Sequence, residues 1–171
     1  VILDFGSQVT QLIARRIREQ RIYCRIFRHD TPATTLAREN LKGIILSGGP
    51  ASVYAPRSPK VDPAIYALGV PVLGICYGMQ LTSHLLGGRV MQARTREYGP
   101  AGIRRVGPSR LSPLLKGLPA KSGVWMSHGD RVERLPKGFR VTASSPDCRM
   151  AAVEEAADRP VAGLAKVAAV A

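Results

Sequence analysis

The chain has 171 residues, of which 45% are hydrophobic and 22% are charged, as expected for a single globular domain with one sizeable core. Its 25 basic and 12 acidic residues give a net charge of +13. The basic residues are spread along the chain, so they predict an arginine-rich solvated surface and do not favour a nucleic-acid interface. No apolar run approaches the roughly 20 residues of a membrane-spanning helix, and the strand predicted at Val1–Phe5 is not a secretory leader.

The cysteines point to a reducing compartment. Cys24, Cys76 and Cys148 are odd in number and no two have the C-x-x-C spacing, which argues against a disulfide framework and against a zinc site. We therefore expect a cytoplasmic protein with no metal. Cys24 and Cys148 are expected to be structural.

Hydrophobic patterning predicts a regular alternation in the first half of the chain. Strands are expected at 1–5, 22–27, 43–46 and 70–75, and helices at 8–20, 34–39, 62–68 and 79–86. After residue 89 the pattern changes to short strands at 102–106, 123–126, 139–144, 150–153 and 161–164. The sequence therefore predicts one α/β domain over residues 1–171, a doubly wound, mostly parallel sheet with a mixed β extension.

The most informative segment is Gly74-Ile75-Cys76-Tyr77-Gly78, which lies between a predicted strand and a predicted helix. A strand, a G-x-C-x-G turn and a helix form the cysteine version of a nucleophile elbow. The turn is tight enough to require both glycines, and it sets the sulfur at a helix N-terminus, where we expect the helix dipole to lower the pKa of Cys76. The alternative is a buried structural cysteine at a strand–helix junction.

Two more glycine-containing turns, Asp4–Gln8 and Ser47–Pro50, follow predicted strands. Sites in open α/β sheets lie at the carboxyl ends of strands, so we expect these turns to border Cys76. Acyl transfer needs two N–H donors for the oxyanion, and Tyr77 and Gly49 are the candidates. Phosphate binding is the competing interpretation of the glycines, but no Gly-Lys-Ser/Thr follows them.

Several segments together resemble a known family. Cys76 with its flanking residues and Gln80 resembles the nucleophile segment of class I (triad-type) glutamine amidotransferases. Four further segments are most similar to the amidotransferase domains of GMP synthases: Asp4–Arg16, Leu46–Val53, Arg96–Gly99 and Val124–Asp130.

The resemblance implies a glutaminase that forms a γ-glutamyl thioester on Cys76 and supplies ammonia for the amination of XMP to GMP. The partner would be an ATP-pyrophosphatase domain or subunit, and ATP and Mg²⁺ would belong to it. We expect no cofactor in this domain and, since no Ser-Gly-Gly-Val-Asp-Ser loop follows, no synthetase domain in this chain. Glutamine is the expected ligand, with neither membrane nor nucleic acid as a partner.

Individual residues take their expected roles from the same resemblance. Gly49 and Tyr77 would form the oxyanion hole, and the substrate glutamine would be surrounded by Gln80, Ser127, His128 and Asp130. Ser127 and His128 would act chiefly through their backbone.

The chain departs from the family near residue 165. The family reads Q-F-H-P-E-V after the segment matching Val161–Leu164, and this chain reads A-K-V-A-A-V. The histidine and glutamate of the triad would correspond to Val167 and Ala169, which can neither move a proton nor orient a base. Neither His29 nor His84 is placed to substitute, and the usual role of His128 is not that of the base.

Three interpretations remain open. The first is an impaired glutaminase, and the second is a non-catalytic glutamine-binding or interaction module on the same fold. A changed reading frame after Leu164 would account for the altered C-terminus in either case. A cysteine hydrolase of the wider elbow-bearing α/β group is the third, and the segments Asp4–Gln8 and Trp125–Asp130 argue against it.

Overall fold

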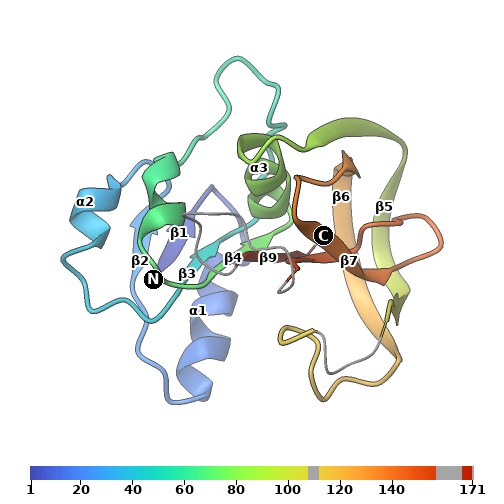
Figure 1. Cartoon of the computed structure of the whole chain (residues 1–171), viewed down its shortest axis with the longest axis horizontal. Helices are drawn as coiled ribbons and strands as arrows, with labels where there is room; N and C mark the ends of the chain where they lie inside the picture. Colours follow the sequence, from blue (N-terminus) through green and yellow to red (C-terminus); the bar gives the residue numbers. More distant parts are fainter. Residues whose placement is uncertain (108–111, 157–166, 171) are drawn as a thin grey trace.

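The computed structural model describes residues 1–107, 112–156 and 167–170, with backbone alone for 93–97, 127–128 and 167–169 (Figure 1). The described strands form one nine-stranded sheet in the order β2-β1-β3-β4-β9-β8-β7-β5-β6. This is the predicted class: an α/β fold with a parallel sheet and an antiparallel extension.

The first half of the chain builds the parallel part. In chain order its elements are β1 (Ile2–Asp4), α1 (Thr10–Glu19), β2 (Ile26–Arg28), α2 (Ala33–Leu36), β3 (Ile44–Leu46), the 3₁₀ helix η1 (Pro63–Ala67), β4 (Val72–Ile75) and α3 (Tyr77–Leu85). All eight overlap predicted elements. The predicted helix 62–68 is a 3₁₀ helix, with Asp62 as its N-cap accepting from the Ala64 N–H at 3.0 Å.

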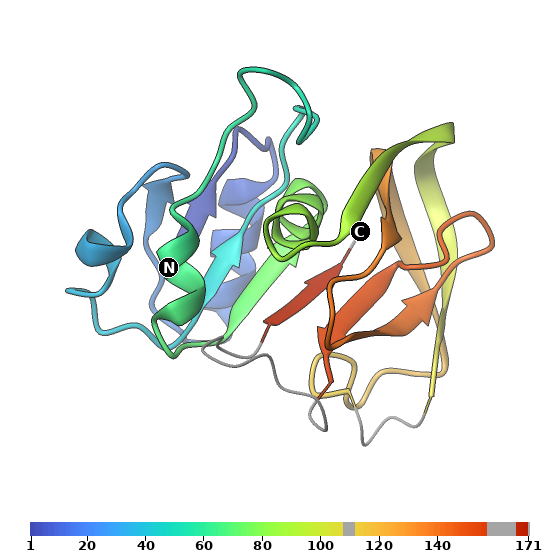
Figure 2. The same cartoon turned by 45° about the horizontal axis from the view of Figure 1, so that its top comes forward.

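Alternating side chains on the parallel strands bury both faces of the sheet. Ile2 and Ile45 pack against Ala14 of α1 on one face. Leu3 and Leu46 belong to the larger core on the other face, which includes residues of α2, η1 and α3. Figure 2 shows α1 behind the sheet, with α3 and η1 in front of it. Helices on both faces make the parallel part doubly wound.

The second half adds the antiparallel strands β5 (Arg89–Arg105), β6 (Lys121–Arg134), β7 (Phe139–Ser144) and β8 (Ala152–Glu155). β5 and β6 form a long ribbon, of which the predicted strands 102–106 and 123–126 are one end. Small clusters, around Leu115 and Ala143 and around Met126 and Cys148, fill its inner side. No helix of the described residues is long and apolar enough to cross a membrane.

β9 (Val167–Val170) joins the two halves. It runs parallel to β4 and antiparallel to β8, so both of its edges are paired. The strand predicted at 161–164 lies outside the described residues. The register places Val167 opposite Val72 and Val170 opposite Ile75.

Candidate active site

Cys76 lies at the junction of β4 and α3, in the strained turn that the sequence predicts. Its backbone has φ 51° and ψ −108°, which non-glycine residues rarely adopt. A Cβ at Gly74 would lie 2.6 Å from the Gly78 oxygen, and one at Gly78 would lie 2.4 Å from the Leu46 oxygen. Both glycines are therefore required, and the turn projects Cys76 at the carboxyl end of β4.

The thiol of Cys76 does not have the lowered pKa that the helix N-terminus suggested. Burial raises the pKa of this thiol above its ordinary value and outweighs a hydrogen bond from the Tyr77 backbone, which lowers it. The charge of Asp130 adds a smaller increase to the same pKa. The expectation of a lowered pKa was wrong because desolvation of the thiolate costs more than the local dipoles return.

Cys76 is nevertheless the accessible cysteine of the chain. It is half-buried, whereas Cys24 and Cys148 are 4% and 3% exposed. Cys24 lies outside the strand predicted for it, and its thiol donates to the Ala14 carbonyl at 3.5 Å. The burial of Cys24 and Cys148 matches the structural role expected for them.

The turn after β1 is organised by Asp4. Its Oδ1 accepts hydrogen bonds from the Gly6 N–H at 3.0 Å, the Ser7 N–H at 3.3 Å and the Thr10 hydroxyl at 2.8 Å. Asp4 thus closes the turn and anchors the start of α1. This accounts for the Asp4–Gln8 pattern through local structure.

The turn after β3 is tied to the same edge of the sheet. The buried Ser47 hydroxyl accepts from the Phe5 N–H at 3.0 Å and donates to the Gly48 carbonyl at 2.9 Å. A Cβ at Gly49 would lie 2.6 Å from the Phe5 oxygen, so a glycine is needed there for the approach of β1. The turns after β1 and β3 therefore meet beside the elbow.

Gly48, which the sequence pattern did not single out as a site residue, contacts Cys76 most directly in this turn. A Cβ at Gly48 would lie 3.6 Å from the Cys76 Cβ and 3.5 Å from the Ser7 Oγ. The Ser47–Pro50 motif signalled a turn at this edge, but only the packing distinguishes which glycine borders Cys76.

Gln80 and Asp130 connect α3 to β6. The buried Gln80 side chain donates from Nε2 to the Asp130 backbone carbonyl at 3.0 Å. Within the described part of the chain the Asp130 Oδ2 is buried and has no hydrogen-bond partner. This carboxylate oxygen is therefore unpaired among the described residues, and the charge of Asp130 contributes to the raised pKa of Cys76.

The remaining predicted residues are in β6 and at the start of α3. The backbones of Ser127 and His128 are in β6, opposite Tyr98 and Glu97, and their side chains are outside the described set. Tyr77 follows Cys76, and its buried side chain donates to the Pro59 carbonyl at 2.6 Å.

Two other histidines make contacts of their own. The His29 Nδ1 lies 2.8 Å from the Lys60 carbonyl oxygen, and the ring stacks on Phe5 with centroids 5.5 Å apart. His84 is exposed on α3 and packs edge-on against Tyr54. These contacts are with residues other than Cys76, and no described group of three His, Cys, Asp or Glu residues could hold a metal ion.

Comparison with known proteins decides the family. The family profile "Glutamine amidotransferase class-I" matches residues 1–164. The chain belongs to the class I glutamine amidotransferase family.

Among the solved structures, a Thermoplasma acidophilum protein described as a GMP synthase subunit has a TM-score of 0.77 and 25% identity over 99% of this chain and 80% of that one. A glutamine amidotransferase from Thermotoga maritima shares the fold, with a TM-score of 0.63 and 20% identity over 98% of this chain and 69% of that one.

The sequence relatives are longer than this amidotransferase chain. Glutamine-hydrolysing GMP synthase of Thermomicrobium roseum is 54% identical over 153 residues, covering 90% of this chain and 28% of that protein. The Lactobacillus acidophilus enzyme is 55% identical, covering 90% and 29%. This chain therefore spans less than a third of the length of these relatives.

Positions 167 and 169, which the resemblance leads us to expect at the histidine and glutamate of the triad, lie inside β9. Val167 pairs with Val72, and Ala169 pairs with Gly74, both before the level of Cys76. The Cys76 N–H instead donates to the Val170 carbonyl at 2.7 Å. With a rise of about 3.3 Å per residue, the backbone of Val167 lies about 10 Å before that of Val170. In this register positions 167 and 169 therefore lie before the level of Cys76.

Proposed function

We propose that this chain is a glutamine amidotransferase domain of the GMP synthase type, in which Cys76 is the nucleophile and catalysis is severely impaired. The observation that carries the proposal is the conformation of Cys76, held at positive φ between two glycines that can be no other residue. Strain of this kind in a non-glycine residue is retained where it positions a reactive group.

The chemistry of the proposed site is acyl transfer. The Cys76 thiolate attacks the carboxamide carbon of glutamine, the carbonyl oxygen becomes an oxyanion, and the C–N bond breaks to release ammonia once the nitrogen has gained a proton. Water then cleaves the thioester to glutamate. Backbone N–H groups of Tyr77 and Gly49 are the proposed oxyanion donors.

The proposed impairment comes from the missing proton carrier. A free thiol is only a few per cent thiolate near neutral pH, and burial raises the pKa of Cys76 further. Val167 and Ala169 supply neither the base nor its orienting partner. Loss of such a unit typically lowers the rate by about 10⁴- to 10⁶-fold.

Glutamine binding is proposed to survive this loss. The free Asp130 carboxylate oxygen suits the cationic α-amino group of glutamine, and its charge is otherwise unpaired in the described structure. Gln80 would hold Asp130 in place through its backbone carbonyl. Ser127 and His128 would present backbone groups of β6 to the substrate.

The ammonia acceptor is proposed to be XMP, bound by an ATP-pyrophosphatase domain or subunit that also carries ATP and Mg²⁺. The longer relatives are glutamine-hydrolysing GMP synthases, which supports this proposal. Residues 1–171 would then form the amidotransferase domain alone.

Labelling with a chloroketone analogue of glutamine tests the proposal. This reagent alkylates a thiol held beside a bound glutamine backbone and needs no general base for ammonia release. We expect peptide mass spectrometry to find the label on Cys76 and glutamine to protect Cys76 from it. The matched Cys76→Ser variant should carry no label at this position. Labelling of Cys24 or Cys148 instead, or no protection by glutamine, would contradict the site.

Turnover separates the impaired enzyme from the second candidate, a non-catalytic glutamine-binding module, which the missing triad residues favour. Glutamate release by the wild-type chain that exceeds that of Cys76→Ser indicates an impaired enzyme. Equal release by the two, with Cys76 still protected by glutamine, indicates a binding module.

A further inference from the structure

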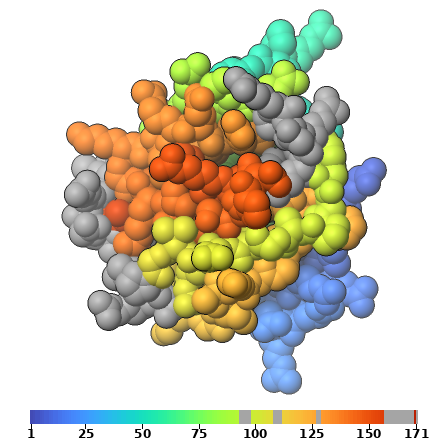
Figure 3. Space-filling view, turned by 90° about the vertical axis from the view of Figure 1, so that its right-hand side faces the viewer, coloured from blue at the N-terminus to red at the C-terminus, as the bar shows by residue number. Residues whose placement is uncertain are grey.

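The outer face of the β5–β6 ribbon is unlike the remaining surface. Exposure alternates along both strands, and one face carries the exposed residues. This ribbon face consists of Tyr98, Pro100, Gly102 and Arg104 of β5 and Lys121, Gly123 and Trp125 of β6. Tyr98 is 64% exposed and Trp125 is 74% exposed. Figure 3 views the molecule from the side on which β5, β6 and β7 lie.

Two glycines at the centre of the ribbon face are not required by the packing or backbone conformation of the described residues. Gly102 lies directly opposite Gly123, and neither has the positive φ that requires glycine. A Cβ added at either position would meet no described atom within 4 Å. Glycine weakens a strand, and within a strand it marks places where another backbone approaches closely. The pair thus indicates an approach from outside the chain.

Both glycines line a hollow with a volume of about 610 Å³. The hollow is also lined by their neighbours Ile103, Arg104, Lys121 and Ser122 and by residues 144–146 at the end of β7. Trp125 lies four residues along β6 from Lys121, about 13 Å away. The ribbon face therefore offers a shallow recess with aromatic side chains at one end and cations at the other.

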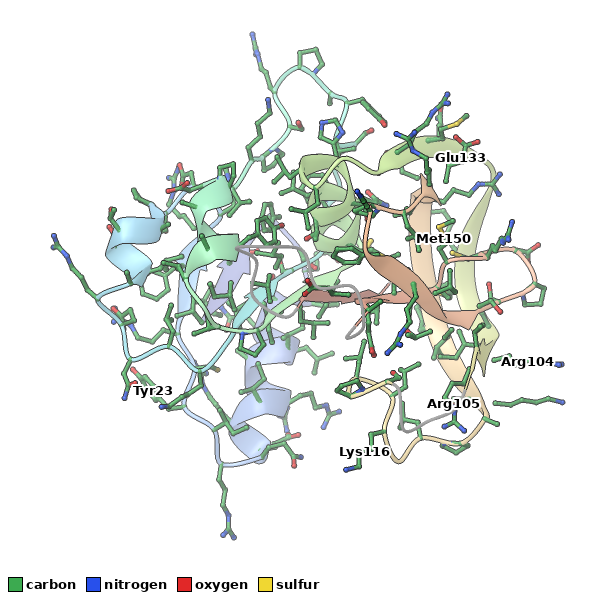
Figure 4. All side chains as sticks on the ribbon, in the orientation of Figure 1. Tyr23, Arg104, Arg105, Lys116, Glu133 and Met150 are labelled. Carbon is green, nitrogen blue, oxygen red and sulfur yellow. The ribbon has the colours of Figure 1, made fainter. Side chains whose placement is uncertain are left out.

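The cations on this face are unbalanced. Arg104 and Lys121 are directly opposite each other across the ribbon, and like charges in that position repel. Among the described residues neither side chain has a hydrogen bond or an ion pair. Figure 4 shows Arg104 projecting from the end of β5, on the side of the molecule away from Tyr23. A carboxylate-bearing partner would relieve the repulsion.

We propose that the ribbon face is the docking surface for an acidic face of the synthetase part of a GMP synthase. This inference rests on the proposed function. The longer relatives supply the occupant, because more than two-thirds of their length lies outside the matched segment. Exposed Trp, Tyr and Arg are the residue types enriched at the centres of protein interfaces.

Trp125 provides the test, since it is the only tryptophan of the chain. The titrant is the synthetase part of the Thermomicrobium roseum relative, accepted as folded when it makes GMP from XMP, ATP and ammonia. We expect Trp125 emission, read against the tryptophan background of the titrant alone, to shift to shorter wavelength and to saturate. Gly102→Val and Lys121→Glu should each weaken this binding by about tenfold or more. The valine side chain in Gly102→Val would occupy open space, and valine favours a strand, so this variant should fold. Weaker binding by it would therefore not be due to unfolding.

The matched control is Tyr23→Ala, which removes an aromatic side chain that is 83% exposed but lies away from the ribbon face. It should bind as the wild type does. The proposal is overturned if Trp125 emission does not shift with a synthetase fragment that makes GMP from ammonia. It is also overturned if Gly102→Val binds the fragment as tightly as the wild type does. A Trp125 shift that depends only on the concentration of this chain would assign the face to a second copy of the chain. A shift produced by a single-stranded oligothymidylate would assign it to nucleic acid. Either result also overturns the proposal. Failure of Cys76 labelling would reject the proposed function and leave this binding result standing.

Discussion

Asp130 combines two effects on Cys76 that a single substitution separates. Its charge raises the pKa of the thiol, and its free oxygen is proposed to bind the amino group of glutamine. We expect Asp130→Asn to increase the rate of alkylation by iodoacetamide severalfold near pH 8, because more of Cys76 is thiolate. The same variant should react more slowly with the chloroketone analogue of glutamine, because the substrate is held less well.

Asp147→Asn is the control, since this exposed aspartate is not among the groups that raise the pKa of Cys76. It should change neither rate. Rates that rise or fall together for the two reagents in Asp130→Asn would show that Asp130 does not have both roles.

Tyr66 makes the stability of the fold sensitive to alkaline pH. Burial raises its pKa to about 12, and its hydroxyl lies 2.8 Å from the Thr82 Oγ1. The unfolded chain ionises this phenol near pH 10, so its contribution is complete below pH 10 and is lost as pH rises through about 12. The loss amounts to about 2–3 kcal/mol in the free energy of unfolding.

Urea denaturation at several pH values measures this effect. Tyr66→Phe should lose about 1 kcal/mol at neutral pH through the missing hydrogen bond and should show a flatter alkaline decline. Tyr23→Phe, at an exposed position, should keep the wild-type decline. An equally steep decline in Tyr66→Phe would mean that another group controls alkaline unfolding.

At the level of elements, the sequence predicted the strand–turn–helix around Cys76 because glycine, cysteine and apolar spacing are local signals. It predicted the inner face of α1 only in part, because apolar spacing points to Val9, Leu12, Ile13 and Ile17. Ile13 and Ile17 pack against the core. Val9 and Leu12 are each 47% exposed, and Thr10 and Ala14 are buried instead. The length of β5 and β6 was also missed, because ribbon pairing depends on residues far apart in the chain. Gly48 was missed because only the three-dimensional packing brings it to Cys76.

Ala168 permits the pairing of β9 on both sides. The family pattern that the sequence resembles would place proline at this position, and proline lacks the N–H that a strand paired on both sides requires. With alanine there, Val167–Val170 can enter the sheet between β4 and β8. A short strand of small apolar residues specifies its register weakly, so a proline would shift the pairing toward earlier residues.

Two variants distinguish these registers through glutaminase activity. Val167→His with Ala169→Glu should restore little, because both residues stay within β9. Replacement of residues 165–169 by Gln-Phe-His-Pro-Glu should end the strand before the introduced proline, bring the histidine to Cys76 and raise glutamate release by about 10⁴-fold or more. Full recovery in the two-residue variant would show that the register is already that of the family.

For the whole molecule, β9 is the described strand that joins the parallel and antiparallel parts of the sheet. Ala169→Pro removes a backbone N–H from β9, so a carbonyl group of a neighbouring strand should lose its hydrogen bond. This should lower the free energy of unfolding by about 1–3 kcal/mol. We expect far-ultraviolet circular dichroism and Trp125 fluorescence to give the same melting curve in the wild type and different curves in this variant. Ala169→Ser retains the N–H and should melt as one unit. Coincident curves in Ala169→Pro at the wild-type midpoint would mean that the two parts are coupled elsewhere.

The central position of β9 also bears on how the chain folds during synthesis. β4 ends at Ile75 and is translated well before residues 167–170, so it leaves the ribosome with one edge unpaired, whereas β8 ends at Glu155, close to β9 in the sequence. Until β9 is inserted, the free edge of β4 can pair with other chains, and contacts between residues so far apart form slowly. The nascent chain is therefore most prone to aggregation before β9 is in place, and this is when a chaperone would protect it most.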